Sequence, residues 1–160
     1  MKEHSENFGE KDQMSVWKEV YHRLIKQALE NAEKMIAASG QSPTECTPVA
    51  RESLMAMIYG MLIAMSVEEL KYYESRWTKI MMAAIANRFF QMDAAESVSL
   101  ATYLYESSKE KSTEYNANIC QLVHIGIDAF YCLDRPEYLA EGMRKVLNAC
   151  YENFGTGEKN

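Results

Sequence analysis

The stretch LMAMIYGMLIAM, from Leu54 to Met65, is apolar on every side of a helix and decides the fold of this chain. The run is 12 residues long, whereas a membrane-crossing helix needs about 20. A helix of this kind is normally wrapped by others in the core of a domain. A second stretch, ANICQLVHIGIDAFYCL over residues 117–133, is similarly apolar in its middle. We therefore predict two central helices.

Small residues predict where these two helices touch. Ala56, Gly60 and Ala64 recur every four residues on the first, and Gly126 with Ala129 offers a matching notch on the second. Small side chains let two helix backbones approach closely. We expect contact near Gly60 and Gly126, and we expect a bulky residue at Gly60 to destabilise the fold by about 1–3 kcal/mol through overpacking.

Three short patterns predict where helices begin. In each, an Asp or Ser is followed three residues later by Glu, which is the arrangement of a capping box. The first side chain accepts from a free backbone N–H of the new helix, and the Glu reaches back to the N–H of the cap. The pairs are Ser66 and Glu69, Asp93 and Glu96, and Asp134 and Glu137.

These signals divide the chain into six helices. At 160 residues the sequence has the length of one domain. Short connections and the absence of a fixed repeat favour a bundle. We predict an all-α, single-domain bundle of about six helices, with helices two and five central. The expected helices cover about 13–39, 48–65, 67–92, 94–109, 114–133 and 135–154, with a disordered tail at 1–12, one helical domain at 13–154 and a frayed tail at 155–160.

Composition excludes several classes of function. The net charge is −6 and there is no basic run, so we expect no nucleic-acid binding, which depends on neutralising phosphates. The N-terminal residues show no apolar secretory segment, and no stretch predicts a membrane span. Four cysteines occur without a CxxC pair. We therefore expect a cytoplasmic protein with reduced thiols.

One polar stripe could carry chemistry. Cys120, His124, Asp128 and Cys132 recur every four residues, so each lies beside the next on one helix. Such side chains can ligate zinc, and His124 beside Asp128 could act as an oriented base. The stripe drifts by about 40° per step, however, so its ends do not converge on one metal ion. We expect a structural role, with a small-ligand or metal site on this stripe as the alternative.

Catalytic motifs are missing from the sequence. There is no GxSxG, no SxxK and no glycine-rich phosphate loop. The three histidines leave few candidates for a general base. We therefore predict a protein that is not an enzyme and needs no cofactor.

With catalysis and nucleic-acid binding excluded, the function that we expect is the binding of another protein. Exposed tyrosines with an acidic rim are typical of such surfaces, and we predict contacts from Tyr72, Tyr103, Tyr105, Glu106 and Glu110. The partner would be another protein, and the chain would be a regulator, an adaptor or an immunity-type inhibitor. A third alternative is a homodimer, in which the outer face of helix three or four pairs across a two-fold axis.

Overall fold

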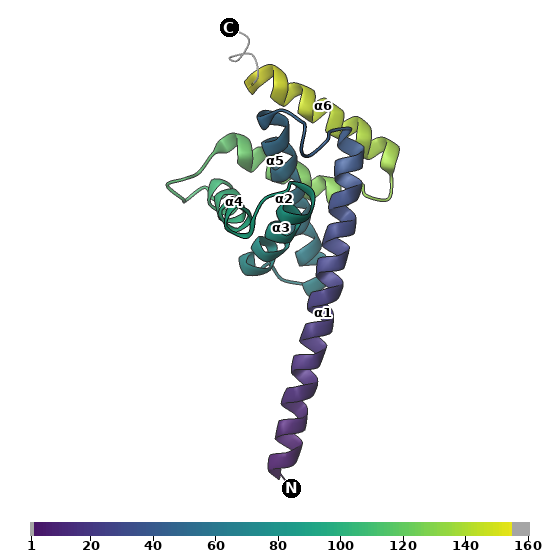
Figure 1. Cartoon of the computed structure of the whole chain (residues 1–160), viewed down its shortest axis with the longest axis vertical. Helices are drawn as coiled ribbons and strands as arrows, with labels where there is room; N and C mark the ends of the chain where they lie inside the picture. The colour runs from purple at the N-terminus through teal and green to yellow at the C-terminus, as the bar shows by residue number, and fades with distance from the viewer. Residues whose placement is uncertain (1, 155–160) are drawn as a thin grey trace.

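The computed structural model describes the backbone of residues 2–154 and the side chains of residues 15–150. Over that backbone the chain forms six α-helices and no strand, which confirms the all-α bundle (Figure 1). The helices are α1 (Lys2–Ser39), α2 (Pro48–Leu70), α3 (Ser75–Phe89), α4 (Ala94–Ser107), α5 (Ala117–Phe130) and α6 (Pro136–Phe154).

Helices α2 and α5 form the centre, as predicted, and share the most extensive contact in the molecule. A Cβ atom on Gly60 would overlap the carbonyl oxygen of Val123, and one on Gly126 would overlap the carbonyl oxygen of Met57. The expected contact near the two glycines is therefore confirmed. Helix α2 is long and apolar enough to cross a membrane, but 72% of its most apolar window is buried by the other helices.

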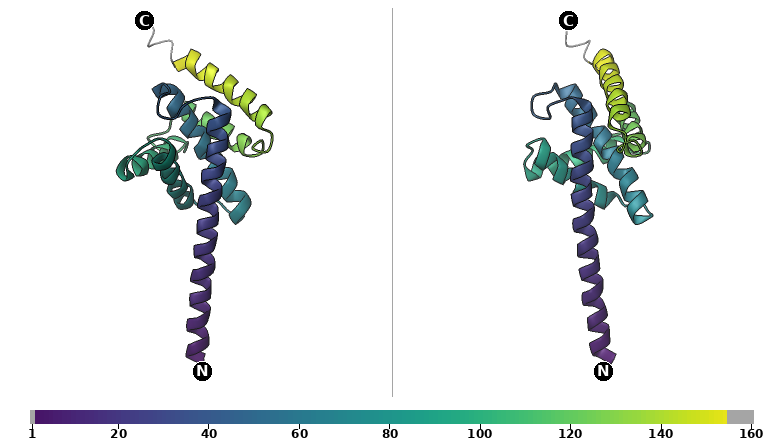
Figure 2. Two further views of the ribbon diagram at one scale, coloured as in Figure 1. Left: turned by 45° about the vertical axis from the view of Figure 1, so that its right-hand side comes forward. Right: turned by 90° about the vertical axis from the view of Figure 1, so that its right-hand side faces the viewer.

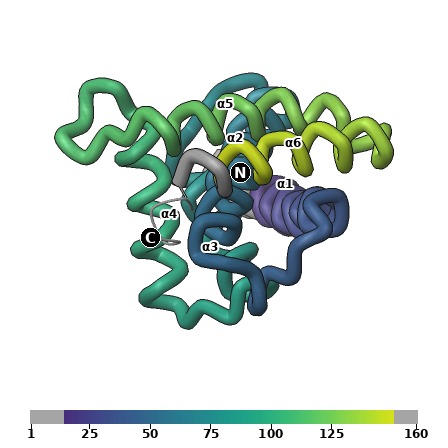
Figure 3. The backbone as a smooth tube through the Cα atoms, turned by 90° about the horizontal axis from the view of Figure 1, so that it is seen from above, coloured from purple at the N-terminus to yellow at the C-terminus, as the bar shows by residue number. Residues whose placement is uncertain are grey.

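The other four helices surround this central pair. Seen from above, α5 and α6 lie on one side of the molecule, and α3 and α4 lie on the opposite side (Figure 3). Helix α1 packs against α6, α3 and α2. The ring of Tyr21 on α1 lies 5.0 Å from that of Trp77 on α3. Helix α6 thus covers the centre on one side, and the packed pair α3 and α4 covers it on the other.

Helix α1 is much longer than expected. It begins at Lys2, and its N-terminal half extends beyond the other helices (Figures 1 and 2). It includes residues 2–12, for which the sequence predicted a disordered tail. These residues contain no proline to end a helix, and Gly9 alone costs only about 1 kcal/mol. Residues 155–160, the predicted frayed tail, lie outside the described part of the chain.

Of the three predicted caps, only Asp93 is confirmed. Its carboxylate accepts from the amide of Glu96 at 2.8 Å and begins α4. The prediction at Ser66 was wrong, because α2 continues through it to Leu70. Ser66 is fully buried inside that helix, where its hydroxyl cannot serve a helix start. The break comes at Lys71, which adopts a left-handed conformation with φ of 62°.

The predicted cap at Asp134 is displaced by one residue. Helix α6 begins at Pro136, and its first hydrogen bond, from the amide of Leu139, is accepted by the carbonyl of Arg135. Proline is favoured at this first position because it has no N–H to satisfy. Helix α5 is likewise capped by a residue outside the predicted pairs, since Asn116 accepts from the amides of Asn118 and Ile119.

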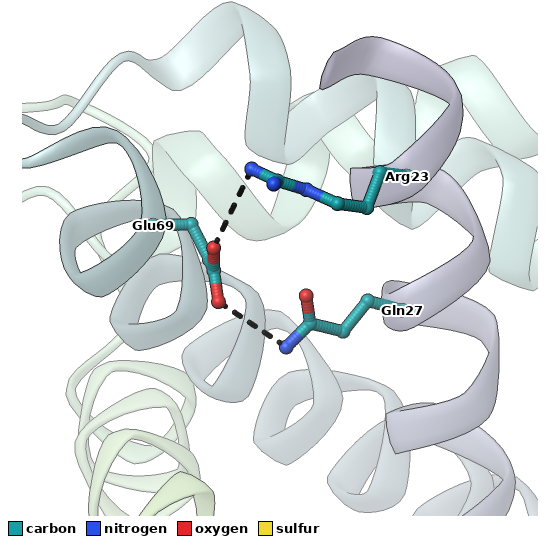
Figure 4. A network of polar contacts seen from close by, with 3 residues as sticks. All are labelled: Arg23, Gln27 and Glu69. Carbon is teal, nitrogen blue, oxygen red and sulfur yellow. Dashed lines mark hydrogen bonds and ion pairs between the residues drawn. The ribbon is translucent and has the colours of Figure 1, made fainter. Parts of the chain in front are cut away.

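Polar contacts fasten the C-terminal end of α2 to its neighbours. Glu69 accepts from Gln27 on α1 at 3.4 Å and pairs with Arg23 at 3.8 Å (Figure 4). On the adjacent turn, Glu68 accepts from the hydroxyl of Tyr131 at 2.9 Å. Exposed contacts of this kind contribute little to stability because solvent screens them, so their main effect is on the orientation of the helices.

Candidate functional site

The structure uses three of the five predicted contact residues within the fold. The hydroxyl of Tyr103 donates to Glu52 on α2 at 3.0 Å. The carboxylate of Glu106 accepts from Ser112 at 2.8 Å and so holds the loop after α4. Tyr103 and Glu106 therefore also hold neighbouring parts of the fold together.

Tyr105 lies between two ammonium groups. The nitrogens of Lys79 and Lys109 each lie 4.4 Å from the centre of its ring. Contact with Lys109 lowers the pKa of the Tyr105 hydroxyl below its ordinary value. The two remaining predicted contacts, Tyr72 in the turn after α2 and Glu110 in the loop after α4, are exposed.

The side chains of Cys120, His124, Asp128 and Cys132 on α5 do not converge on one point. Cys120 is buried and its thiol donates to the carbonyl of Ser108 at 3.5 Å, whereas His124 and Asp128 are exposed and Cys132 is half-buried. Within residues 15–150, no group of three or more His, Cys, Asp or Glu side chains could hold a metal ion. The exposed His124 and Asp128 also show that α5 is apolar on one face, and not on all sides as its sequence suggested.

A polar hollow lies where the N-terminal ends of α2 and α5 meet. It is lined by Glu52, Ser53, Asn116 and Asn118, together with apolar residues. Glu52 already accepts from Tyr103, and the Asn116 side chain caps α5. Because these groups are engaged in holding the helix ends, the hollow has a structural explanation.

The most distinctive surface is a groove between α5 and α6. Two adjoining hollows of about 180 and 160 Å³ lie between these helices and share Ile125 and Val146. One also includes Cys132 with Leu139, near the connecting turn, and the other includes Gln121 with Cys150, near the far ends. The helices are therefore antiparallel, and the groove follows them for ~20 Å, since each helical residue rises about 1.5 Å.

The walls of this groove are mostly apolar, with Asn118 and Gln121 as polar residues toward one end. Its two helices touch each other far less than α2 touches α5, so their facing side chains stay partly open to solvent. The apolar lining is Leu122, Ile125, Ala129, Leu139, Met143, Val146 and Ala149. Tyr138, which is 63% exposed, stands at one end.

Gly142 lies in this groove and differs from the two glycines of the core. Cβ atoms on Gly60 and Gly126 would collide with neighbouring backbone, whereas no described atom outside its own helical turn lies within 4 Å of a Cβ on Gly142. Glycine inside a helix costs roughly 0.5–1 kcal/mol relative to alanine. The packing of this chain therefore gives no reason for a glycine at position 142.

Sequence reasoning placed α6 correctly but missed the groove. The structure buries Leu139, Met143 and Leu147 of this helix in the core. The unexplained Gly142 was the available signal, because a glycine in the middle of an amphipathic helix needs a packing reason.

Comparisons with protein-family models, curated proteins and solved structures found no match for this chain.

Proposed function

We propose that this is a cytoplasmic, non-catalytic protein that binds an α-helix of another protein in the groove between α5 and α6. The open groove at Gly142 is the observation that carries this proposal. A glycine that the fold itself does not require, set in an apolar channel ~20 Å long, gives a partner helix room to approach the backbone of α6.

The lining of the groove fits this kind of partner. Recognition of an amphipathic helix relies on an apolar groove that receives side chains spaced three and four residues apart. The apolar side chains of this groove lie along both helices, from Leu122 to Ala129 on α5 and from Leu139 to Ala149 on α6. Its lining also includes Asn118, Gln121 and Asp128, which stay in contact with water. A regulator, an adaptor or an immunity-type inhibitor could each act by capturing a helix in this way.

The experiment blocks the groove with one aromatic side chain. Gly142→Phe fills the channel, and Asn148→Phe adds the same side chain to an exposed position of α6 that does not line the groove. Each tagged variant is expressed in the cells that naturally make the protein, purified, and compared with the original chain by quantitative mass spectrometry. Thermal melts confirm that both variants fold.

We expect a protein that co-purifies in near-stoichiometric amount with the original chain and with Asn148→Phe. Its recovery should fall at least about tenfold with Gly142→Phe, because one blocking side chain at the centre of an interface costs at least ~1.4 kcal/mol. Equal recovery with all three chains, or no stoichiometric partner with any of them, would contradict the proposal.

A further inference from the structure

Helices α3 and α4 lie on the opposite side of the molecule from α5 and α6 (Figure 3), and their outer face carries a second apolar hollow. A shallow hollow between the two helices is lined by Lys79, Ile80, Ala83, Val98, Ala101 and Thr102. Val98 is 59% exposed and Ile80 is 37% exposed. Exposed aliphatic side chains that gather on one face of a helix pair indicate an interaction surface.

The two helices run antiparallel. Lys79, near the start of α3, lies over the ring of Tyr105, near the end of α4. Ala83, further along α3, shares the hollow with Val98, which lies nearer the start of α4. This face therefore consists of two packed helices of similar length, 15 and 14 residues, with small residues between them.

Within the bounds of these two helices the charged residues divide by sign, and Glu74 and Lys109 lie just outside them. All the charged residues of α3 are basic: Arg76, Lys79 and Arg88. Both charged residues of α4 are acidic: Glu96 and Glu106. A surface that is basic on one helix and acidic on its antiparallel neighbour is complementary to itself. An isologous contact requires this property, because the same patch appears on both sides of the two-fold axis.

We propose that this face binds a second copy of the chain, with α3 of each copy lying over α4 of the other. A two-fold axis parallel to the helices brings α3 of one copy over α4 of its partner and makes the two antiparallel. The N-terminal end of α3, with Arg76, then faces the C-terminal end of α4, with Glu106. Val98 and Ile80 of both copies meet near the axis.

The apolar centre would supply most of the binding, and the charges would fix the orientation. Burial of apolar surface contributes about 25 cal/mol per Å², whereas complementary charges at a rim mainly exclude wrong orientations. The α5–α6 groove stays open in this dimer, so each copy could still bind a partner helix. The dimer does not depend on the function proposed for the groove.

The test measures the molar mass of the full chain by light scattering over a dilution series. We expect the mass of two chains at high concentration and of one chain at low concentration. Val98→Asp should give one chain throughout, because it places a carboxylate at the apolar centre without touching the core. Lys145→Glu on α6 reverses one charge away from the face and should leave the dimer unchanged.

A charge exchange tests the arrangement itself. Arg76→Glu and Glu106→Arg should each raise the dissociation constant of the dimer at least about tenfold by opposing like charges. The double variant should recover an affinity close to that of the original chain. A single chain at every concentration, a dimer that tolerates Val98→Asp, or a double variant no tighter than the single variants would overturn the proposal.

Discussion

Gly60 of α2 lies so close to Val123 of α5 that a Cβ atom on residue 60 would overlap the carbonyl oxygen of Val123 and lie 2.9 Å from the amide nitrogen of Ile127. The contact is reciprocal, since Gly126 of α5 lies in the same way against Met57 of α2. In both cases the nearest atoms belong to the backbone and not to a flexible side chain. The backbones themselves meet, and the centre of the bundle depends on both glycines.

Gly60→Ala should lower the free energy of unfolding by about 3 kcal/mol, since even one methyl group forces the two central helices apart. Helix propensity alone would predict a gain of ~1 kcal/mol, so the sign distinguishes the two effects. Gly142→Ala is the matched control and should raise stability by about 0.5–1 kcal/mol, because its Cβ meets open space. Urea unfolding followed by circular dichroism measures both. Equal stability of Gly60→Ala and the original chain would refute the close crossing.

Asp93→Ala should lower the unfolding free energy by about 1 kcal/mol, because it removes the side chain that caps α4. Asp134→Ala provides the comparison. The first hydrogen bond of α6 is accepted by Arg135, so removing the Asp134 carboxylate should change stability by less than about 0.5 kcal/mol. The same unfolding titration measures both variants. Equal losses would mean that Asp134 also caps its helix.

Ser66→Ala should stabilise the protein by about 1 kcal/mol. The Ser66 hydroxyl is fully buried in α2 and has no hydrogen-bond partner among the described residues, and alanine removes an unsatisfied polar group while improving helix propensity. Ser39→Ala is the opposite case, because the buried Ser39 hydroxyl donates to Ile36 at 2.6 Å and accepts from Gln41. The free energy of unfolding of Ser39→Ala should be about 1 kcal/mol lower than that of the original chain. If the melting temperatures of both variants shifted in the same direction, the contrast between an unpaired Ser66 hydroxyl and a bonded Ser39 hydroxyl would be contradicted.

The centre of the fold could be predicted because its signals are local. An apolar run without a polar side and a glycine at the right spacing are both visible in Leu54 to Met65. The caps show the limit of local patterns. Ser66 and Asp93 begin the same motif, yet Asp93 is exposed at a helix start and Ser66 is buried within α2. Only the packing of α2 distinguishes them.

The surface was harder to predict because it depends on distant neighbours. Nothing in the sequence indicated that the hydroxyl of Tyr103 donates to Glu52, which lies 51 positions earlier in the chain. The groove between α5 and α6 exists because α6 packs on α1 and α2 and leaves α5 partly uncovered. No periodicity in the sequence encodes that choice of neighbours.

Tyr59 should make the protein sensitive to alkaline pH. Its side chain is fully buried in α2, and burial raises the pKa of its hydroxyl far above the ordinary value of 10.0, with a further contribution from Tyr73. The folded chain therefore keeps a proton that the unfolded chain releases above about pH 10. Stability from this group is fully present below that pH and falls by ~1.4 kcal/mol for each further pH unit.

Tyr59→Phe has no proton to release at this position, so its stability should fall less steeply above about pH 10. The hydroxyls of Tyr73 and Thr78 influence the pKa of Tyr59, but no described group meets the Tyr59 hydroxyl in hydrogen-bond geometry, so the substitution should be tolerated at neutral pH. Tyr138→Phe, at a tyrosine that is 63% exposed, should follow the original chain. Unfolding free energies measured from about pH 8 to about pH 11 test this difference. Parallel curves for Tyr59→Phe and the original chain would show that Tyr59 ionises as readily in the folded protein as in the unfolded one.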